Sequence, residues 1–382
     1  MARFRLSIFG LVILALIVTA CGDQAPADSP AATDDDSTPA ATATPGDSPD
    51  ETDEPEPEPA PSGGRLAAVR ERDQLICGVN GSLPGFSFLD DQGDMQGFDA
   101  DFCRAIAAAV LGDAEKVDFR PLSADQRGPA LQTGEVDVLV RNTTWTVSRD
   151  TQWGLFAPTT FYDGQAIMAR ADLNATTIED LDGATVCVQS GTTTELNLAD
   201  AETQAGIDFE PLTFSEIDPT YQAYEEERCD AVTSDRSQLV ARRTEFANPD
   251  DHTILETVLS KEPLGPVAPL GDDEWFQVVK WTVFATIEAE ELGITSENVA
   301  DEAANNDNPV VQRLLGVTPE GAEAFESGLG LDADWVVDVI SQVGNYAEIF
   351  DRNLGPDTPF ELERGQNALW TDGGLLYAPP YR

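Results

Sequence analysis

The stretch VDVLVRNTTWTVSRD, Val136–Asp150, joins a short apolar segment to a polar loop. An apolar run of this length indicates a buried strand, and the loop would leave its carboxyl end, where open α/β sheets bind ligands. The loop carries Arg141 and Arg149, although the 382-residue chain has 70 acidic and only 22 basic residues. A guanidinium matches a carboxylate through two parallel hydrogen bonds. Arg149 therefore either binds a ligand carboxylate or pairs with a nearby acid such as Asp150.

Strands and helices alternate on both sides of this stretch. The patterns predict strands at 74–80, 116–122, 185–189, 207–214 and 230–235, and helices at 98–114, at 218–229 and within 265–293. This alternation is typical of an α/β fold with mixed, mostly parallel sheets flanked by helices. We expect Asp99 to cap the helix at 98–114 and Gly112 to end it. We expect residues 298–309 to form a loop.

The charge of the chain excludes several functions. Residues 65–382 hold 58 acidic and 20 basic residues, so the body lacks the basic surface that nucleic acids or anionic lipids require. The chain has one histidine, His252, which leaves almost nothing from which to build a zinc site or a Ser/His/Asp triad. We therefore expect no metal, no cofactor and no nucleic-acid partner.

The N-terminus resembles a targeting segment. Residues 1–21 combine a short basic start with a mostly apolar stretch of 15 residues, fewer than the roughly 20 that span a bilayer as a helix. The ending VTACG resembles the cleavage box of bacterial lipoproteins, which implies lipidation of Cys21. An uncleaved anchor and an ordinary signal peptide are the alternatives. Residues 22–64 are rich in proline, alanine, threonine and acids, and we expect a disordered tether.

Four further cysteines, Cys77, Cys103, Cys187 and Cys229, remain in the body of the chain. An even number of cysteines outside the cytoplasm indicates disulfides, and three pairings are possible.

Three other features lie next to predicted strands. In SGTTTELNL, Ser190–Leu198, Thr192 either helps to bind an anion at a helix N-terminus or only caps that helix. Asp235 ends the strand at 230–235 and either receives an ammonium group or caps the next helix. In GSLPGFSF, Phe86 or Phe88 is either a pocket wall or core. Two anion sites, a carboxylate and an aromatic wall together describe the binding of an α-amino acid.

At these residues the sequence resembles the periplasmic amino-acid-binding proteins of ABC importers, in their general L-amino-acid-binding branch. The resemblance starts near Arg65 and rests on GFDADFCRAIAAAVLGDAEKV, GEVDVLVRNTTWTVSRD, DGATVCVQSGTTTELNLAD, CDAVTSDRSQL, LSKEPLG and the C-terminal stretch from VGNYAEIF onward. It implies the type 2 periplasmic-binding fold, with two lobes joined by a two-strand hinge near 163–166 and 261–265. The first lobe would be 65–163 with 264–382, and the second 164–263.

The resemblance also implies roles for single residues. Arg149 would hold the ligand α-carboxylate, and the backbone around Asn142 with Thr144 would hold the carboxylate and amino group. Thr192 and the amide of Thr193 would hold the carboxylate from the other lobe. Asp235 would take the ammonium group and Phe86 would pack on the ligand side chain.

The resemblance further implies disulfides within each lobe, Cys77–Cys103 and Cys187–Cys229. Two departures stand out. Gly128 replaces a bulkier residue and would loosen one wall, and Arg236 follows Asp235, where it either faces away or favours acidic or amide ligands.

The function implied is capture of L-amino acids, without catalysis, for the permease subunits of an importer. We expect an extracytoplasmic monomer, anchored to the membrane through Cys21. The alternatives are a sensor that presents its ligand to a membrane receptor and a dehydratase on the same fold. A dehydratase would need an acid or base in the cleft, which His252 is poorly placed to supply.

Overall fold

The computed structural model describes residues 64–319, 321 and 323–382, all of which lie in the second of two compact units, residues 59–382. The expected signal segment 1–21 with Cys21, and residues 22–63 of the expected tether, lie outside the described residues. Gly64 is not tether, because it begins helix α1 (Gly64–Arg72). Across the described part, the helices are too short or too polar to span a membrane.

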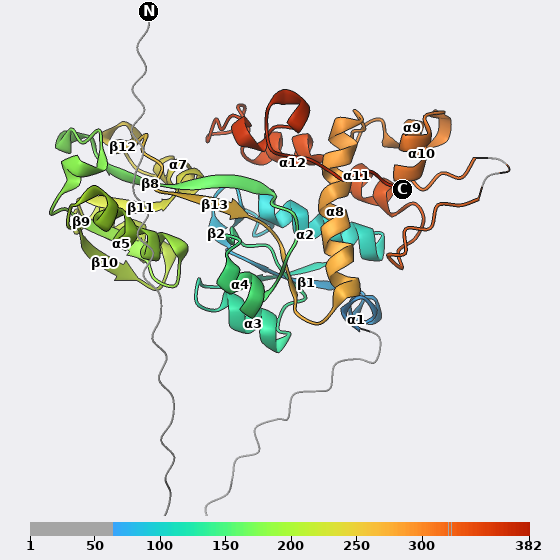
Figure 1. The fold of residues 1–382 in the computed structure, drawn as a ribbon, viewed down its shortest axis with the longest axis horizontal. Coiled ribbons are helices and arrows are strands. Elements are labelled where there is room, and N and C mark those ends of the chain that lie inside the picture. Colours follow the sequence, from blue (N-terminus) through green and yellow to red (C-terminus); the bar gives the residue numbers. More distant parts are fainter. Residues whose placement is uncertain (1–63, 320, 322) are drawn as a thin grey trace, which may run out of the picture. The chain divides into compact units, whose positions relative to one another are not determined.

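The first lobe is built on a five-stranded sheet in the order β5-β1-β6-β14-β7 (Figure 1). Strands β5, β1 and β6 are parallel, whereas β14 is antiparallel to both β6 and β7. The strands are β1 Leu75–Val79, β5 Val117–Pro121, β6 Val138–Leu139, β7 Gly154–Phe156 and β14 Val267–Pro269. A small antiparallel sheet contains β2 Ser82–Leu83, β3 Ser87–Leu89 and β4 Met95–Gln96.

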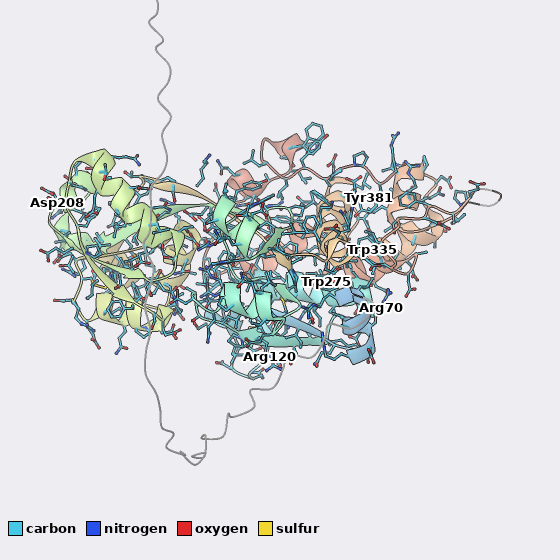
Figure 2. All side chains as sticks on the ribbon, turned by 60° about the horizontal axis from the view of Figure 1, so that its bottom comes forward. Arg70, Arg120, Asp208, Trp275, Trp335 and Tyr381 are labelled. Carbon is cyan, nitrogen blue, oxygen red and sulfur yellow. A yellow bond between two sulfur atoms is a disulfide. The ribbon has the colours of Figure 1, made fainter. Side chains whose placement is uncertain are left out.

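Helices surround the first sheet and bury most of the largest apolar cluster of the described chain, which also extends into the second lobe. They are α2 Phe98–Leu111, α3 Arg127–Thr133, α4 Val147–Gln152, α8 Asp273–Glu291, α9 Val299–Asn305, α10 Pro309–Leu314, α11 Trp335–Val343 and α12 Tyr346–Asn353. Trp275 and Trp335 lie inside this lobe and Arg120 at its surface (Figure 2). The Trp275 indole donates to the carbonyl of Asp137 at 2.8 Å, which ties α8 to the strand that carries the arginine loop.

The second lobe is built on a six-stranded sheet in the order β10-β9-β11-β8-β12, with β13 also paired to β8. Strands β10, β9 and β11 are parallel, and β8 is antiparallel to β11, β12 and β13. The elements are β8 Phe161–Arg170, β9 Thr185–Gln189, β10 Glu210–Phe214, β11 Ala231–Asp235, β12 His252–Ile254, β13 Ser260–Leu264, α5 Thr193–Ala205, α6 Ile217–Glu225 and α7 Arg236–Arg243.

Strands β8 and β13 connect the two sheets (Figure 1). They pair along their length, with Asp163 opposite Glu262 and Phe161 opposite Leu264. Every crossing of the chain between the lobes is therefore a strand hydrogen-bonded to its neighbour, which leaves few routes for relative movement.

Most predicted elements are confirmed, but two expectations are wrong. Residues 299–305 form helix α9 and not a loop, since their alanine and glutamate favour helix and Val299 is fully buried. Asp99 does not cap α2, whose first turn already contains it; Gly97 precedes the helix and no side chain caps it. Gly112 ends α2 in the left-handed conformation, as expected.

Candidate functional site

A small buried cavity lies between the lobes, at the carboxyl ends of β6 and β11 and at the start of α5. Its volume is about 20 Å³, enough for about one water molecule, so the lobes are tightly closed. The lining residues include every predicted ligand residue except Phe86. They are Arg127, Arg141, Asn142, Thr144, Arg149, Gln189, Thr192, Thr193, Thr194, Ser234, Asp235 and Gln238.

Arg149 reaches this cavity from α4. The hydroxyl of Thr146 caps that short helix by accepting from the Arg149 N–H. Arg149 is 6% exposed, and its guanidinium lies 4.9 Å from the centre of the Trp153 ring and donates to the carbonyl of Thr144. Asp150 instead accepts from the N–H of Phe156. The surface pair of Arg149 with Asp150 is therefore absent, and the guanidinium stays available to a ligand.

Arg141 and Asn142 form the first turn after β6. Asn142 adopts a positive φ of 28°, and its N–H donates to the Asp99 carboxylate at 2.7 Å. That N–H is therefore engaged within the protein, while the Asn142 side-chain amide lines the cavity. Arg141 is 3% exposed and donates to the Leu122 carbonyl at 2.9 Å. Burial lowers the pKa of Arg141 to about 10.

Arg127 is a third buried guanidinium at the cavity, 3% exposed, on the first residue of α3. It donates to the carbonyl of Ala124 and, across the lobe junction, to that of Gly191. Burial, followed by repulsion from Arg141 and Arg149, lowers the pKa of Arg127 well below its usual value.

Gly128 does not loosen the wall behind these arginines, because the Trp153 ring fills the space beside it. A Cβ on Gly128 would lie 2.8 Å from the Trp153 ring, so the ring occupies the space that a side chain would take. Trp153 also lies 5.6 Å from the Arg127 guanidinium, which places it against two of the three arginines.

The second lobe presents hydroxyl groups at the start of α5. Thr192 caps this helix by accepting from the Glu195 N–H, and its own hydroxyl donates to the carbonyl of Gln189. The capping role that the sequence left open is therefore present, and Thr192 also lines the cavity. The Thr193 hydroxyl lies 3.3 Å from that of Thr144, which belongs to the other lobe.

Asp235 lies at the end of β11, is 6% exposed, and makes no capping hydrogen bond to α7. Burial raises the pKa of Asp235 well above its usual value, and the nearby Asp163 and Glu262 carboxylates add to the shift. Arg236 faces away from the cavity, where it donates to the Leu255 carbonyl and pairs with Glu256.

Glu262, on β13, joins the lobes beside the cavity and is only 1% exposed. One carboxylate oxygen accepts from Thr144 of the first lobe at 2.6 Å and from Thr193 of the second lobe at 2.8 Å. The other accepts from Asn197 at 2.8 Å and from Ser260 at 2.5 Å. Both threonines thus give their hydroxyl protons to Glu262, so their remaining lone pairs can only accept from a ligand.

Phe86 does not line the cavity. It is fully buried and contacts Phe98 and Phe161 edge-on, with ring centroids 6.1 and 5.4 Å apart. The core position that the sequence left open for Phe86 is the one observed.

Two disulfides hold the lobes internally, Cys77–Cys103 in the first and Cys187–Cys229 in the second. Each links a strand of the sheet to a segment that packs on it. This pairing is the one implied by the resemblance.

Sequence reasoning did not single out Arg127 or Glu262. Glu262 lies in LSKEPLG, one of the stretches that carry the resemblance. Arg127 follows the strand predicted at 116–122, so the strand-end position that marked Arg149 was also a signal for Arg127. In the described residues, the His, Cys, Asp and Glu side chains form no group able to hold a metal ion.

Two α/β lobes that share a pair of strands and close on a buried polar cavity define the two-lobed class of solute-binding proteins. The profile of the bacterial extracellular solute-binding proteins, family 3, matches residues 75–355. The chain belongs to this family.

Characterised relatives share most of the chain. The general L-amino acid-binding periplasmic protein AapJ of Rhizobium johnstonii is 49% identical over 85% of this chain and 94% of its own length. The glutamate/glutamine/aspartate/asparagine-binding protein BztA of Rhodobacter capsulatus is 45% identical over 85% of this chain and 95% of its own. A periplasmic binding protein of an ABC transporter from Brucella ovis, solved with glutathione bound, superposes with a TM-score of 0.80 and 48% identity, covering 84% of this chain and 99% of that one.

Proposed function

We propose that this protein captures L-amino acids outside the cytoplasm and delivers them to an ABC importer. The observation that carries the proposal is that Arg149 and Asp235, from opposite lobes, line the same buried cavity. One cavity thereby offers a cation and an anion, as the two ends of a zwitterion require. The names of AapJ and BztA, as amino-acid-binding proteins, support the same ligand class.

In this proposal Arg149 binds the ligand α-carboxylate, aided from the second lobe by Thr192 and the Thr193 amide. Asp235 binds the ammonium group. Thr144 completes the ammonium site, since its hydroxyl proton is committed to Glu262 and its lone pairs are acceptors. The Asn142 side chain supports both ends of the ligand.

The lobes divide at 65–163 with 264–382 and at 164–263, and they move about the β8–β13 pair. Because the cavity of about 20 Å³ is smaller than any amino acid, the lobes part to admit a ligand. The ligand then stabilises the closed form by the contacts it makes to both lobes.

We further propose that the chain is a monomer anchored through lipidated Cys21, with residues 22–63 as the tether, and that the closed form docks on the permease. We propose no catalytic step. The histidine His252 lies in β12, shares a hydrogen bond with Tyr224, and does not line the cavity. A permease gene next to this one would separate import from sensing.

The test is a thermal-unfolding panel of the full-length protein with each of the twenty L-amino acids. A ligand at about 100 times its Kd adds about 2.7 kcal/mol to the free energy of unfolding. We expect at least one L-amino acid to raise the Tm by several degrees and its D-enantiomer to do so much less. A flat response to all twenty would refute the proposal.

A further inference from the structure

The cavity contains more positive charge than one α-carboxylate can use. Arg127, Arg141 and Arg149 all line it, and each is at least nine-tenths buried. A carboxylate binds one guanidinium fork through two parallel hydrogen bonds. If Arg149 takes the α-carboxylate, Arg127 and Arg141 remain.

Neither of these two arginines is neutralised by a contact within the described chain. Ion pairs among the described residues involve neither Arg127 nor Arg141. Their hydrogen bonds go to the backbone carbonyls of Ala124, Gly191 and Leu122, and one long bond goes from Arg141 to the Asn142 amide oxygen at 3.4 Å.

One nitrogen of each guanidinium has no hydrogen-bond acceptor among the described residues. These nitrogens are Nη1 of Arg127 and Nη2 of Arg141, and neither is completely enclosed by protein atoms. A buried charge without a partner is costly, so a partner is expected from outside the protein. Since both side chains line the cavity, that partner is the ligand.

Carboxylates act on the two arginines only at longer range. Asp99 and Glu216 act on Arg141, Asp125 acts on Arg127, and Asp235 acts on both. The Asp99 carboxylate accepts from the Asn142 N–H and so stabilises the backbone turn; it makes no ion pair with Arg141. Asp235 has the proposed ammonium group to bind.

Arg127 is also held in place by its own lobe. Its guanidinium lies against Trp153, for which Gly128 leaves the room, and its Nε donates to the Ala124 carbonyl. A rigid fork loses little side-chain entropy when it binds an anion, which favours a specific contact.

Building on the proposed function, we propose that Arg127 and Arg141 form a subsite for a second carboxylate, so that the preferred ligands are L-amino acids with an anionic side chain. The subsite distinguishes a side-chain carboxylate from the amide of the same shape. Arg141 is then a ligand residue in addition to its hydrogen bond to the Leu122 carbonyl.

The test compares L-glutamate with L-glutamine, which differ only in that charge, by isothermal titration calorimetry on the full-length protein. The wild type should bind glutamate about tenfold or more tightly than glutamine, because a charged hydrogen bond contributes about 1.5–3 kcal/mol. Arg127→Gln and Arg141→Gln should each reduce the glutamate-to-glutamine ratio by about tenfold. Arg120→Gln, on the exposed face of the same lobe, should leave the ratio at its wild-type value.

The outcomes separate this inference from the proposed function. If the wild type binds glutamine as tightly as glutamate, the subsite is refuted while amino-acid binding stands. If it binds no amino acid, the proposed function fails first. Should Arg127→Gln or Arg141→Gln unfold, Arg127→Met and Arg141→Met remove the charge and keep a flexible, unbranched side chain. An unchanged ratio in these folded variants, together with a wild-type preference for glutamate, would assign the preference to other residues and overturn the subsite.

Discussion

The two faces of the cavity have opposite chemistry. The first lobe contributes three guanidiniums, Arg127, Arg141 and Arg149, whereas the second contributes hydroxyls, amides and the single carboxylate of Asp235. Each arginine of the first lobe donates to a backbone carbonyl of the same lobe, and Trp153 lies against two of the three. The hydroxyls of the second lobe lie on a helix start that moves with that lobe. The first lobe is therefore suited to hold an anion by itself, and the second to recognise the ligand as the lobes close.

The largest effect should come from removing the proposed anchor of the first lobe. Arg149→Ala should weaken L-amino-acid binding by about 2–5 kcal/mol, since it leaves a buried carboxylate without its partner. Calorimetry with the tightest ligand of the thermal panel measures the loss. Arg120→Ala serves as the matched control, and a loss of less than about threefold in Arg149→Ala would show that another arginine holds the α-carboxylate.

The second lobe is tested by its carboxylate. Asp235→Asn should weaken L-glutamate binding by roughly 10- to 100-fold, because the ammonium group loses a charged acceptor. Glutarate, which lacks the amino group, should bind the variant no more weakly than it binds the wild type. Equal losses for both ligands would mean that Asp235 acts on the structure and not on the ammonium group.

The bridge between the two faces is tested by Glu262→Ala. The change removes four hydrogen bonds, one of which, from Thr144, joins the two lobes, and should lower the free energy of unfolding by about 1–3 kcal/mol. In small-angle X-ray scattering without ligand, the variant should have a larger radius of gyration than the wild type. Identical scattering curves would show that other contacts keep the lobes together.

The smallest effect on stability should come from Asp99, whose carboxylate holds the Asn142 turn of the first lobe. Burial raises the pKa of Asp99 from 3.8 to about 7. As pH rises, the carboxyl group therefore loses its proton at a lower pH in the unfolded chain than in the folded protein. The group therefore lowers stability as pH rises from about 4 to about 7, and the penalty persists above pH 7. Asp99→Asn removes the penalty while keeping an acceptor for the Asn142 N–H, and should raise the Tm by roughly 2–4 °C at pH 8.

The gain of Asp99→Asn should shrink on acidification to pH 5, where the wild-type group is protonated. Calorimetric scans at both pH values measure it. Asp208→Asn, an exposed change in the second lobe (Figure 2), should show no such pH-dependent gain. A gain that is equal at the two pH values would contradict the assignment to Asp99.

Local patterns predicted the strands and helices that flank the cavity. The strand at 185–189 and the left-handed end of α2 at Gly112 follow from residue type and spacing alone. The position of Arg149 after a strand also marked it as a site residue. In each case the signal lies within a few residues of the feature it predicts.

The missed features depend on contacts between distant segments. Arg127 is held at the cavity by contacts to Trp153 and Gly191, which lie far along the chain. Glu262 could not be assigned without knowing that β13 passes between Thr144 and Thr193. Phe86 is the opposite case, a residue assigned to the site that is not part of it. Its position in a loop after a strand allowed a role in ligand binding, but its ring packs in the aromatic core against Phe161.

The position of Glu262 has a consequence for how this protein could diverge. Its carboxylate accepts from Thr144 of the first lobe and from Thr193 of the second, so it stabilises the closed form independently of the contacts that a ligand makes. If a fraction of the molecules closes without ligand, the apparent affinity falls by that fraction. A substitution at Glu262, Ser260 or Asn197 would alter this fraction without touching the ligand. Sequence change at these positions would then let descendants match their binding strength to scarce or abundant nutrients while keeping the same choice of nutrient.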